Sequence, residues 1–187
     1  MLFTIFLAFI LTQRIFELFV ARNNEIWMKS RGALEFGKTH YVFMVLIHSL
    51  FFVVYTGEVF LLEKQISPVW PFLLIIFILT QTGRIWALSS LGKYWNTKII
   101  VLPNADIVKK GPYRFLKHPN YVIVTIEFIV IPLMFQAYFT AFIFSFLNVL
   151  ILSIRIPAEE KALKELTEYE NEFLKSNRFV PNIFKKW

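Results

Sequence analysis

Three runs of about twenty mostly apolar residues constrain the fold of this chain more than any other feature. They cover residues 2–20, 41–62 and 69–88, and each is long enough for one helix across the hydrocarbon core of a bilayer. The 187 residues are 57% hydrophobic and include 22 Phe, and the mean hydropathy is +0.56. Such a chain has too little polar surface to cover a soluble globule of its size. The sequence therefore predicts an all-α integral membrane protein.

A fourth apolar stretch, residues 121–154, is interrupted at Pro132 and at Gln136. It is too long for one spanning helix and too short for two full ones. We therefore expect a tight helical hairpin whose two ends lie on the same side of the membrane. The prediction is five transmembrane helices, of which the last two form this hairpin.

Basic residues are unevenly distributed among the connecting segments. The loop between the second and third spans contains only Lys64, and the tip of the hairpin contains no basic residue, whereas the other loops and the tail are rich in Lys and Arg. The positive-inside rule then predicts a multi-pass protein of the cell membrane with its N-terminus outside and its C-terminus in the cytoplasm. A net charge of +7 distributed in this way fits loops that face anionic membrane lipid, and it argues against a nucleic-acid partner.

Two smaller elements are expected beside the spans. Residues 92–111 predict a small interfacial β-like hairpin, with a β-prone segment at 97–102, turn residues at 103–106 and a short return at 107–108. The tail from Pro157 predicts a C-terminal amphipathic helix. Its apolar stripe consists of Leu163, Leu166, Tyr169 and Phe173. No repeat or linker divides the chain, so we expect one domain over residues 1–187.

A polar cluster marks the beginning of the predicted hairpin, where residues 111–121 read GPYRFLKHPNY. Pro119 suits the first turn of a helix, and the free backbone N–H groups at such a helix end attract an anion. With Arg114, Lys117 and His118 nearby, the cluster can hold a cofactor carboxylate or phosphate. The alternative is that the two cations anchor the protein at the membrane surface and that His118 caps the helix.

A second cluster marks the end of the hairpin. Arg155 and Glu159 are spaced i and i+4, so they share one helical face, either as a structural ion pair or as the wall of an active site. Glu127 lies inside the fourth span, where a lone carboxylate is costly. We expect it to be protonated, paired with a cation such as Arg14 or Arg155, or exposed to a wet cavity. Arg14 itself is expected to form a structural polar seam with Glu17.

Several kinds of site are excluded by residue type and spacing. The chain has no cysteine, and its histidines, His40, His48 and His118, lie at unrelated spacings, so we expect no metal site. None of the six glycines forms a phosphate-binding loop.

Taken together, the two clusters resemble the isoprenylcysteine carboxyl methyltransferase family of integral membrane methyltransferases. The family motifs G-P-Y-x-x-x-R/K-H-P-x-Y and R-I-x-x-E-E-x-x-L correspond here to GPYRFLKHPNY and RIPAEEKAL. The resemblance extends over about residues 80–181.

This resemblance implies S-adenosylmethionine as the cofactor and a cofactor-binding and catalytic core in residues 69–187, after two N-terminal spans in residues 1–68. It implies that Arg155 and Glu159 act on the methyl acceptor. The residues that it assigns to the cofactor are His118, which would bind its carboxylate, Pro119, Asn120, Tyr121 and Glu160.

The acceptor implied by the resemblance is a lipophilic molecule dissolved in the membrane. The short members of the family suggest the hydroxyl of an alkylpyrone or alkylresorcinol, and a functional link to a polyketide synthase. A prenylated cysteine carboxylate is the alternative acceptor. A nicotinamide-dependent membrane reductase and a non-catalytic scaffold or transporter are the alternative functions.

Overall fold

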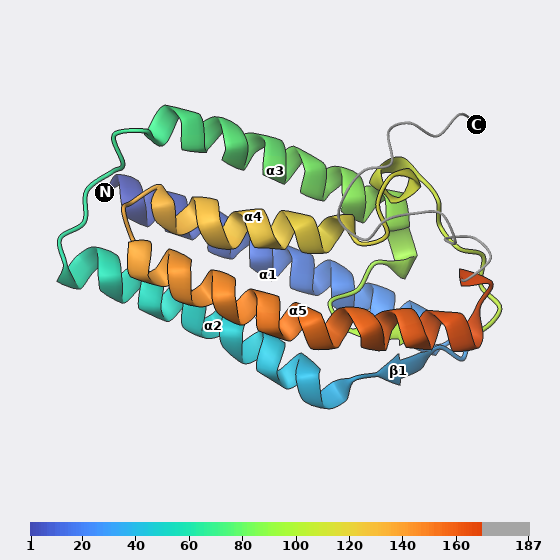
Figure 1. Cartoon of the computed structure of the whole chain (residues 1–187). Helices are drawn as coiled ribbons and strands as arrows, with labels where there is room; N and C mark the ends of the chain where they lie inside the picture. The colour runs from blue at the N-terminus through green and yellow to red at the C-terminus, as the bar shows by residue number, and fades with distance from the viewer. Residues whose placement is uncertain (170–187) are drawn as a thin grey trace.

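Five helices run alongside one another in the computed structural model, which describes residues 1–169 (Figure 1). The helices are α1 (Leu2–Lys29), α2 (Lys38–Leu61), α3 (Trp70–Leu91), α4 (Pro119–Leu133) and α5 (Tyr138–Leu166). Two short strands, β1 (Leu34–Phe36) and β2 (Ile99–Val101), and two 3₁₀ helices, η1 (Gly92–Tyr94) and η2 (Gly111–Arg114), lie in the connections.

Four of the helical segments have the length and apolar character that a membrane crossing requires: α1, α2, α3 continued through η1, and α5. The remaining helix, α4, is also apolar but has 15 residues. The predicted helical membrane protein is thus confirmed, with four helices of spanning length in the described chain. The predicted hairpin is confirmed as well, because α4 and α5 pack against each other and are joined by residues 134–137.

The two ends of the bundle differ in character (Figure 1). The turn end carries the N-terminus and the short connections at residues 62–69 and 134–137. The loop end carries both strands, both 3₁₀ helices and the last turns of α5. Both polar clusters of the sequence therefore lie at the loop end.

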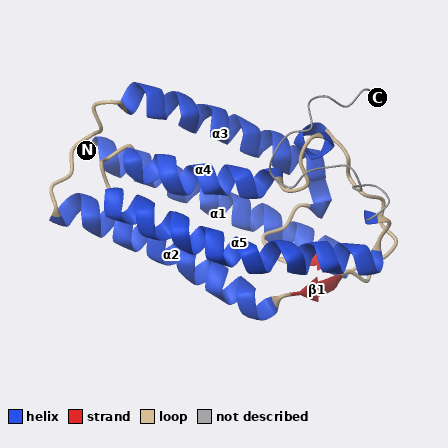
Figure 2. Cartoon of the chain, viewed as in Figure 1, coloured by secondary structure: helices blue, strands red, loops and turns tan. Residues whose placement is uncertain are grey.

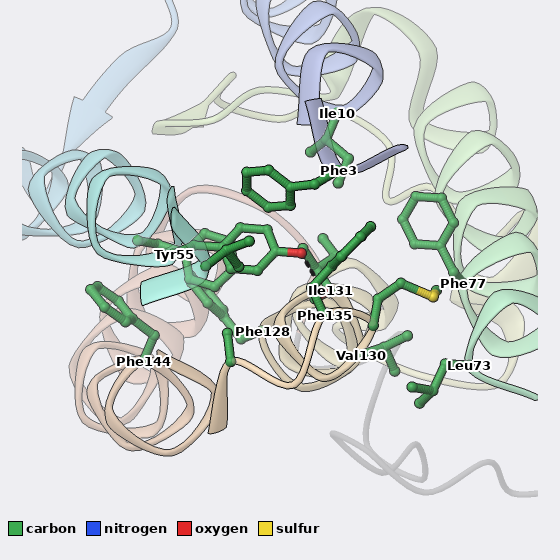
Figure 3. Close-up of a cluster of buried hydrophobic side chains, with 14 residues drawn as sticks. Phe3, Ile10, Tyr55, Leu73, Phe77, Phe128, Val130, Ile131, Phe135 and Phe144 are labelled. Carbon is green, nitrogen blue, oxygen red and sulfur yellow. Dashed lines mark hydrogen bonds between the residues drawn. The ribbon is translucent and has the colours of Figure 1, made fainter. Parts of the chain in front are cut away.

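Aromatic side chains fill the core toward the turn end (Figure 3). Phe3 of α1 makes edge contacts with Tyr55 of α2 and with Phe135, at centroid distances of 5.2 and 5.1 Å. The hydroxyl of Tyr55 donates to the carbonyl of Ile131 at 2.9 Å. This bond satisfies one of the carbonyl groups that the last turn of α4 leaves without a helical partner. The core thereby fixes α1, α2 and α4 around the region that carries the site.

The small sheet differs from the predicted local hairpin (Figure 2). Strand β2 pairs antiparallel with β1 from the loop between α1 and α2, with Phe36 opposite Ile99 and Leu34 opposite Val101. Residues 103–104 do form the expected turn, but residues 107–108 are not a strand. The prediction placed the partner strand nearby in sequence, whereas the strand that is available in space comes from some sixty residues earlier.

The prediction of a C-terminal amphipathic helix that begins at Pro157 is also wrong. Helix α5 continues without a break through Pro157 to Leu166, so no separate helix begins at this proline. Its last turns place Ala158, Ala162 and Leu163 against the apolar face of the sheet, where Ile99 and Val101 are buried. This packing offsets the hydrogen bond that an internal proline removes from a helix. Of the predicted stripe, Phe173 lies outside the described residues.

Candidate active site

A cavity of about 330 Å³ opens inside the bundle and is lined by side chains from all five helices. Its wall toward α2 and α4 is largely apolar and includes Phe51, Val124 and Phe128. At the loop end its wall is polar and includes Tyr121 and Arg155. A space with one apolar part and one polar part suits an amphipathic ligand.

Arg155 is a deeply buried charged group at the polar end, with 4% of its surface exposed. Its Nε donates to the hydroxyl of Tyr121 at 2.9 Å, and its Nη2 donates to the carbonyl of Thr97. The Tyr121 hydroxyl in turn donates to Glu159. Arg155 and Glu159, one helical turn apart on α5, are therefore linked through a tyrosine of α4.

His118 lies beside this group as the N-cap of α4. Its Nε2 is 3.1 Å from Glu160 and its Nδ1 is 4.0 Å from Glu159. Its ring is also roughly parallel to that of Tyr121, with centroids 5.4 Å apart. Two successive carboxylates of α5 thus hold the His118 imidazole over the first turn of α4.

Gly111 allows the preceding loop to approach α3. Its φ of +55° lies in the left-handed region, and a Cβ there would be 2.1 Å from the Ser90 hydroxyl oxygen and 2.8 Å from the Trp86 indole nitrogen. The close approach buries Tyr113 of η2 against Ala87 and Ile123. Burial and the nearby Glu159 carboxylate raise the pKa of Tyr113 above its usual range, so the phenol remains neutral at the cavity wall.

Three buried polar atoms in the polar part of the cavity have no hydrogen-bond partner among residues 1–169: Nη1 of Arg155, Nε1 of Trp95 and Oδ1 of Asn120. Two are donors and one is an acceptor. Buried polar groups are normally paired, so these atoms indicate a place for a polar ligand. With Lys117 also in the wall, Trp95 and Asn120 fit a cofactor that carries both a carboxylate and an amine, as S-adenosylmethionine does.

A buried ion network lies along another wall of the same cavity. Glu127 of α4 accepts from Arg14 of α1 at 2.7 Å and from Arg84 of α3, and both cations also contact Glu17. Gln81 adds a bond to Glu127 at 2.8 Å. The predicted polar seam of Arg14 and Glu17 is confirmed. Glu127 is paired with cations, which was one of the alternatives expected from the sequence. Its partners are Arg14 and Arg84, whereas Arg155 points to Tyr121 and Thr97.

The structure brings together most of the residues singled out from the sequence. The side chains of His118, Asn120, Tyr121, Arg155 and Glu159 line the cavity. Pro119 begins α4 and is buried, and Glu160 contacts His118, but neither is among the cavity-lining residues of the described chain. Sequence reasoning did not identify Tyr41, Thr97 or Asn148, which also line the cavity. Asn148 carried a usable signal, because an amide within an apolar span is uncommon.

The fold is that of a multi-pass membrane protein. At the site, a cluster of polar side chains of the kind found in active sites closes one end of an apolar cavity within the bundle. The model of the isoprenylcysteine carboxyl methyltransferase family matches residues 73–165, a range that contains both clusters. The chain belongs to this family, and it is accordingly a membrane methyltransferase.

Two bacterial relatives match over nearly their whole length. The chain is 48% identical to "Uncharacterized protein YpbQ" of Bacillus subtilis (strain 168) over 164 residues, 88% of this chain and 98% of that protein. It is 29% identical to an "Uncharacterized protein" of Haemophilus influenzae over 160 residues, 85% of this chain and 93% of that protein. Neither name states a substrate.

Proposed function

We propose that the protein transfers a methyl group from S-adenosylmethionine to an oxygen atom of a lipophilic acceptor dissolved in the membrane. The observation that carries the proposal is the junction of Arg155, Tyr121 and Glu159 at the polar end of an otherwise apolar cavity. The bound cofactor supplies an electrophilic methyl group on a sulfonium, whose C–S bond breaks as the new C–O bond forms and leaves its electron pair on sulfur.

Binding of the cofactor is assigned to the first turn of α4. His118, held by Glu160, and the nearby Lys117 provide cationic or donor groups for the cofactor carboxylate. Tyr121 and Asn120 follow on the same turn and line the cavity. Pro119 sets the start of this helix by its fixed φ. Glu160 acts by positioning His118.

Arg155 and Glu159 are assigned to the acceptor. Nη1 of Arg155 has no partner among the described residues, and it can orient an acceptor oxygen and stabilise its negative charge. Glu159, which already accepts from Tyr121, can take the proton when the acceptor is a hydroxyl. A carboxylate acceptor has no proton to lose, and Arg155 alone then aligns it. Catalysis of either reaction consists chiefly of alignment.

Two acceptor classes fit this chemistry. The family description favours a prenylated cysteine carboxylate. Resemblance to the short members of the family favours the hydroxyl of an alkylpyrone or alkylresorcinol, together with a functional link to a polyketide synthase, and this second class rests on that resemblance alone. In either case we propose that the loop end faces the cytoplasm, because the basic loops lie there.

The experiment uses the purified full chain in lipid nanodiscs, methyl-tritiated S-adenosylmethionine and a lipid extract of Bacillus subtilis membranes. Label should enter the lipid with the wild type, and Arg155→Ala and Glu159→Ala should abolish the transfer. Alkali separates the two acceptor classes, because it releases tritiated methanol from a methyl ester and leaves an ether intact. Absence of both S-adenosylhomocysteine binding and label transfer would overturn the proposal in favour of a reductase, scaffold or transporter.

A further inference from the structure

We propose that Asn148 binds a hydrogen-bond donor on the methyl acceptor, and that the acceptor therefore carries a hydroxyl or N–H group in addition to the oxygen that is methylated. The proposal rests on the methyltransferase function proposed above and defines the acceptor class more narrowly. Asn148 lies on α5 with 1% of its surface exposed, and its side chain lines the cavity.

The hydrogen bonds of Asn148 leave one atom unsatisfied. Its Nδ2 donates to the hydroxyl of Thr125 on α4 at 3.0 Å. Its Oδ1 is buried and has no partner in the part of the chain that the structure describes. A buried amide oxygen without a donor costs free energy, and an occupant of the cavity that supplies the donor removes this cost.

The orientation of the Asn148 amide is fixed by Thr125. The Thr125 hydroxyl donates its single hydrogen to the carbonyl of Tyr121 at 2.8 Å. It can therefore only accept from Asn148, which requires Nδ2 on the Thr125 side and leaves Oδ1 as the free atom. An amide oxygen accepts hydrogen bonds and cannot donate them, so the missing partner is a donor.

His48 of α2 adds a second acceptor to the cavity wall. Its Nδ1 is 2.8 Å from the carbonyl of Met44, which can only accept, so Nδ1 carries the hydrogen. The Nε2 of the neutral ring is then an acceptor. The ring also packs edge-on against Phe128, with centroids 5.0 Å apart, which places it in the apolar part of the cavity.

The cavity lining is therefore complementary to an acceptor with two different polar ends. Arg155 presents an unpaired donor, which fits the oxygen that receives the methyl group. Asn148 lies seven residues before Arg155, two helical turns along the same face of α5, and it presents an unpaired acceptor. A lipid whose only polar group is the methylated oxygen leaves Oδ1 of Asn148 without a donor. The enzyme should therefore methylate such a lipid with a lower kcat/KM.

The test compares the wild type with Asn148→Leu, a substitution of similar shape, in the nanodisc assay with tritiated S-adenosylmethionine and Bacillus subtilis lipid extract. We expect kcat/KM to fall about tenfold to a hundredfold, as for loss of one buried hydrogen bond to substrate, while calorimetric affinity for S-adenosylhomocysteine is unchanged. Ser145→Ala is the matched control, because Ser145 Oγ on the same helix is also buried without a partner among the described residues, but Ser145 does not line this cavity. It should retain full activity.

A second measurement does not depend on the folding of any variant. The methylated lipid made by the wild type is isolated, and mass spectrometry in deuterated solvent counts its exchangeable hydrogens, of which at least one should remain. A product without an exchangeable hydrogen, or an Asn148→Leu enzyme with wild-type kcat/KM, would overturn the inference and leave the methyltransferase proposal standing. If the wild-type protein neither binds S-adenosylhomocysteine nor transfers label, both the inference about Asn148 and the methyltransferase proposal would be overturned.

Discussion

Nε of Arg155 donates to the hydroxyl of Tyr121 at 2.9 Å, and the same hydroxyl donates its hydrogen to Glu159. The tyrosine thus determines where the guanidinium and the carboxylate lie relative to each other. Because Tyr121 is on α4 and the other two are on α5, the hairpin itself assembles the three groups.

Tyr121→Phe should lower kcat/KM for methyl transfer by about tenfold to a hundredfold, because hydrogen bonds to charged groups contribute about 1.5–3 kcal/mol. The ring and its stacking on His118 remain, so the fold should be intact. Tritium transfer measures the loss. Tyr94→Phe is the control, since Tyr94 does not line the cavity and should behave as the wild type. Equal rates for both variants would contradict the role of the Tyr121 hydroxyl.

His118→Ala should weaken S-adenosylhomocysteine binding by about tenfold or more, because a charged or donor group near the cofactor carboxylate is lost. Calorimetry on the purified protein measures the affinity, and the melting temperature checks the fold. Glu160→Gln should show a smaller loss, since it retains a hydrogen bond to the imidazole. Lys161→Ala, at a side chain that is 77% exposed, serves as the control. An unchanged affinity in His118→Ala would count against the cofactor assignment.

Glu127→Ala should destabilise the protein by about 3–5 kcal/mol, because it leaves Arg14 and Arg84 buried beside a single carboxylate. The expected observation is a lower melting temperature in detergent. Arg22→Ala is the matched control, because the Arg22 side chain is 70% exposed and lies 3.9 Å from Glu25. The double variant Arg84→Met/Glu127→Leu removes one charge of each sign, and it should recover part of the loss. A double variant less stable than Glu127→Ala would show that the network is not a balanced set of charges.

The lengths of the apolar runs predicted the helices well, since a chain in lipid must satisfy its backbone groups within each helix. The break at Pro132 and Gln136 likewise predicted the hairpin. Contacts between segments that are distant in sequence could not be predicted from the apolar runs. The partner of β2 and the Arg84–Glu127 contact both depend on how distant segments are rotated toward one another. Pro157 misled the prediction because packing of α5 on the sheet outweighs the local signal.

Much of the candidate site was also accessible from sequence, since the two motifs have recognisable residue types and the hairpin brings their ends together. The linking role of Tyr121 and the unpaired oxygen of Asn148 were not accessible, because they depend on single hydrogen bonds. Glu58 is a similar case: it accepts from the backbone N–H of Thr140 at 2.7 Å and so caps α5 from a neighbouring helix.

Stability should decrease in acid through Glu35, which joins the sheet to α1. A 2.6 Å hydrogen bond from Lys29, with added attraction from Lys98, lowers the pKa of Glu35 below its ordinary value of 4.5. The folded state therefore binds this proton less readily than the unfolded state. The contribution is complete above about pH 4.5 and is lost as pH falls through the lower folded pKa.

Melting temperatures between pH 3 and pH 6 test this linkage, in roughly the range where glutamates titrate. Glu35→Gln should lower the melting temperature at pH 6 and should flatten its decrease toward pH 3. Glu63→Gln, in the connection at the turn end, is the control and should retain the wild-type profile. A Glu35→Gln profile parallel to that of the wild type would contradict the linkage.

The short length of α4 has a consequence for where chemistry takes place. Fifteen residues extend roughly 22 Å, less than the roughly 30 Å hydrocarbon thickness of a bilayer. The turn at residues 134–137 keeps the other end of α4 level with the start of α5, so the deficit falls at His118. With the start of α5 at one boundary of the hydrocarbon layer, the first turn of α4 would lie below the other boundary. In the proposed reaction, the water-soluble methyl donor would then enter the bundle to meet its partner, and the lipid partner would not need to leave the bilayer.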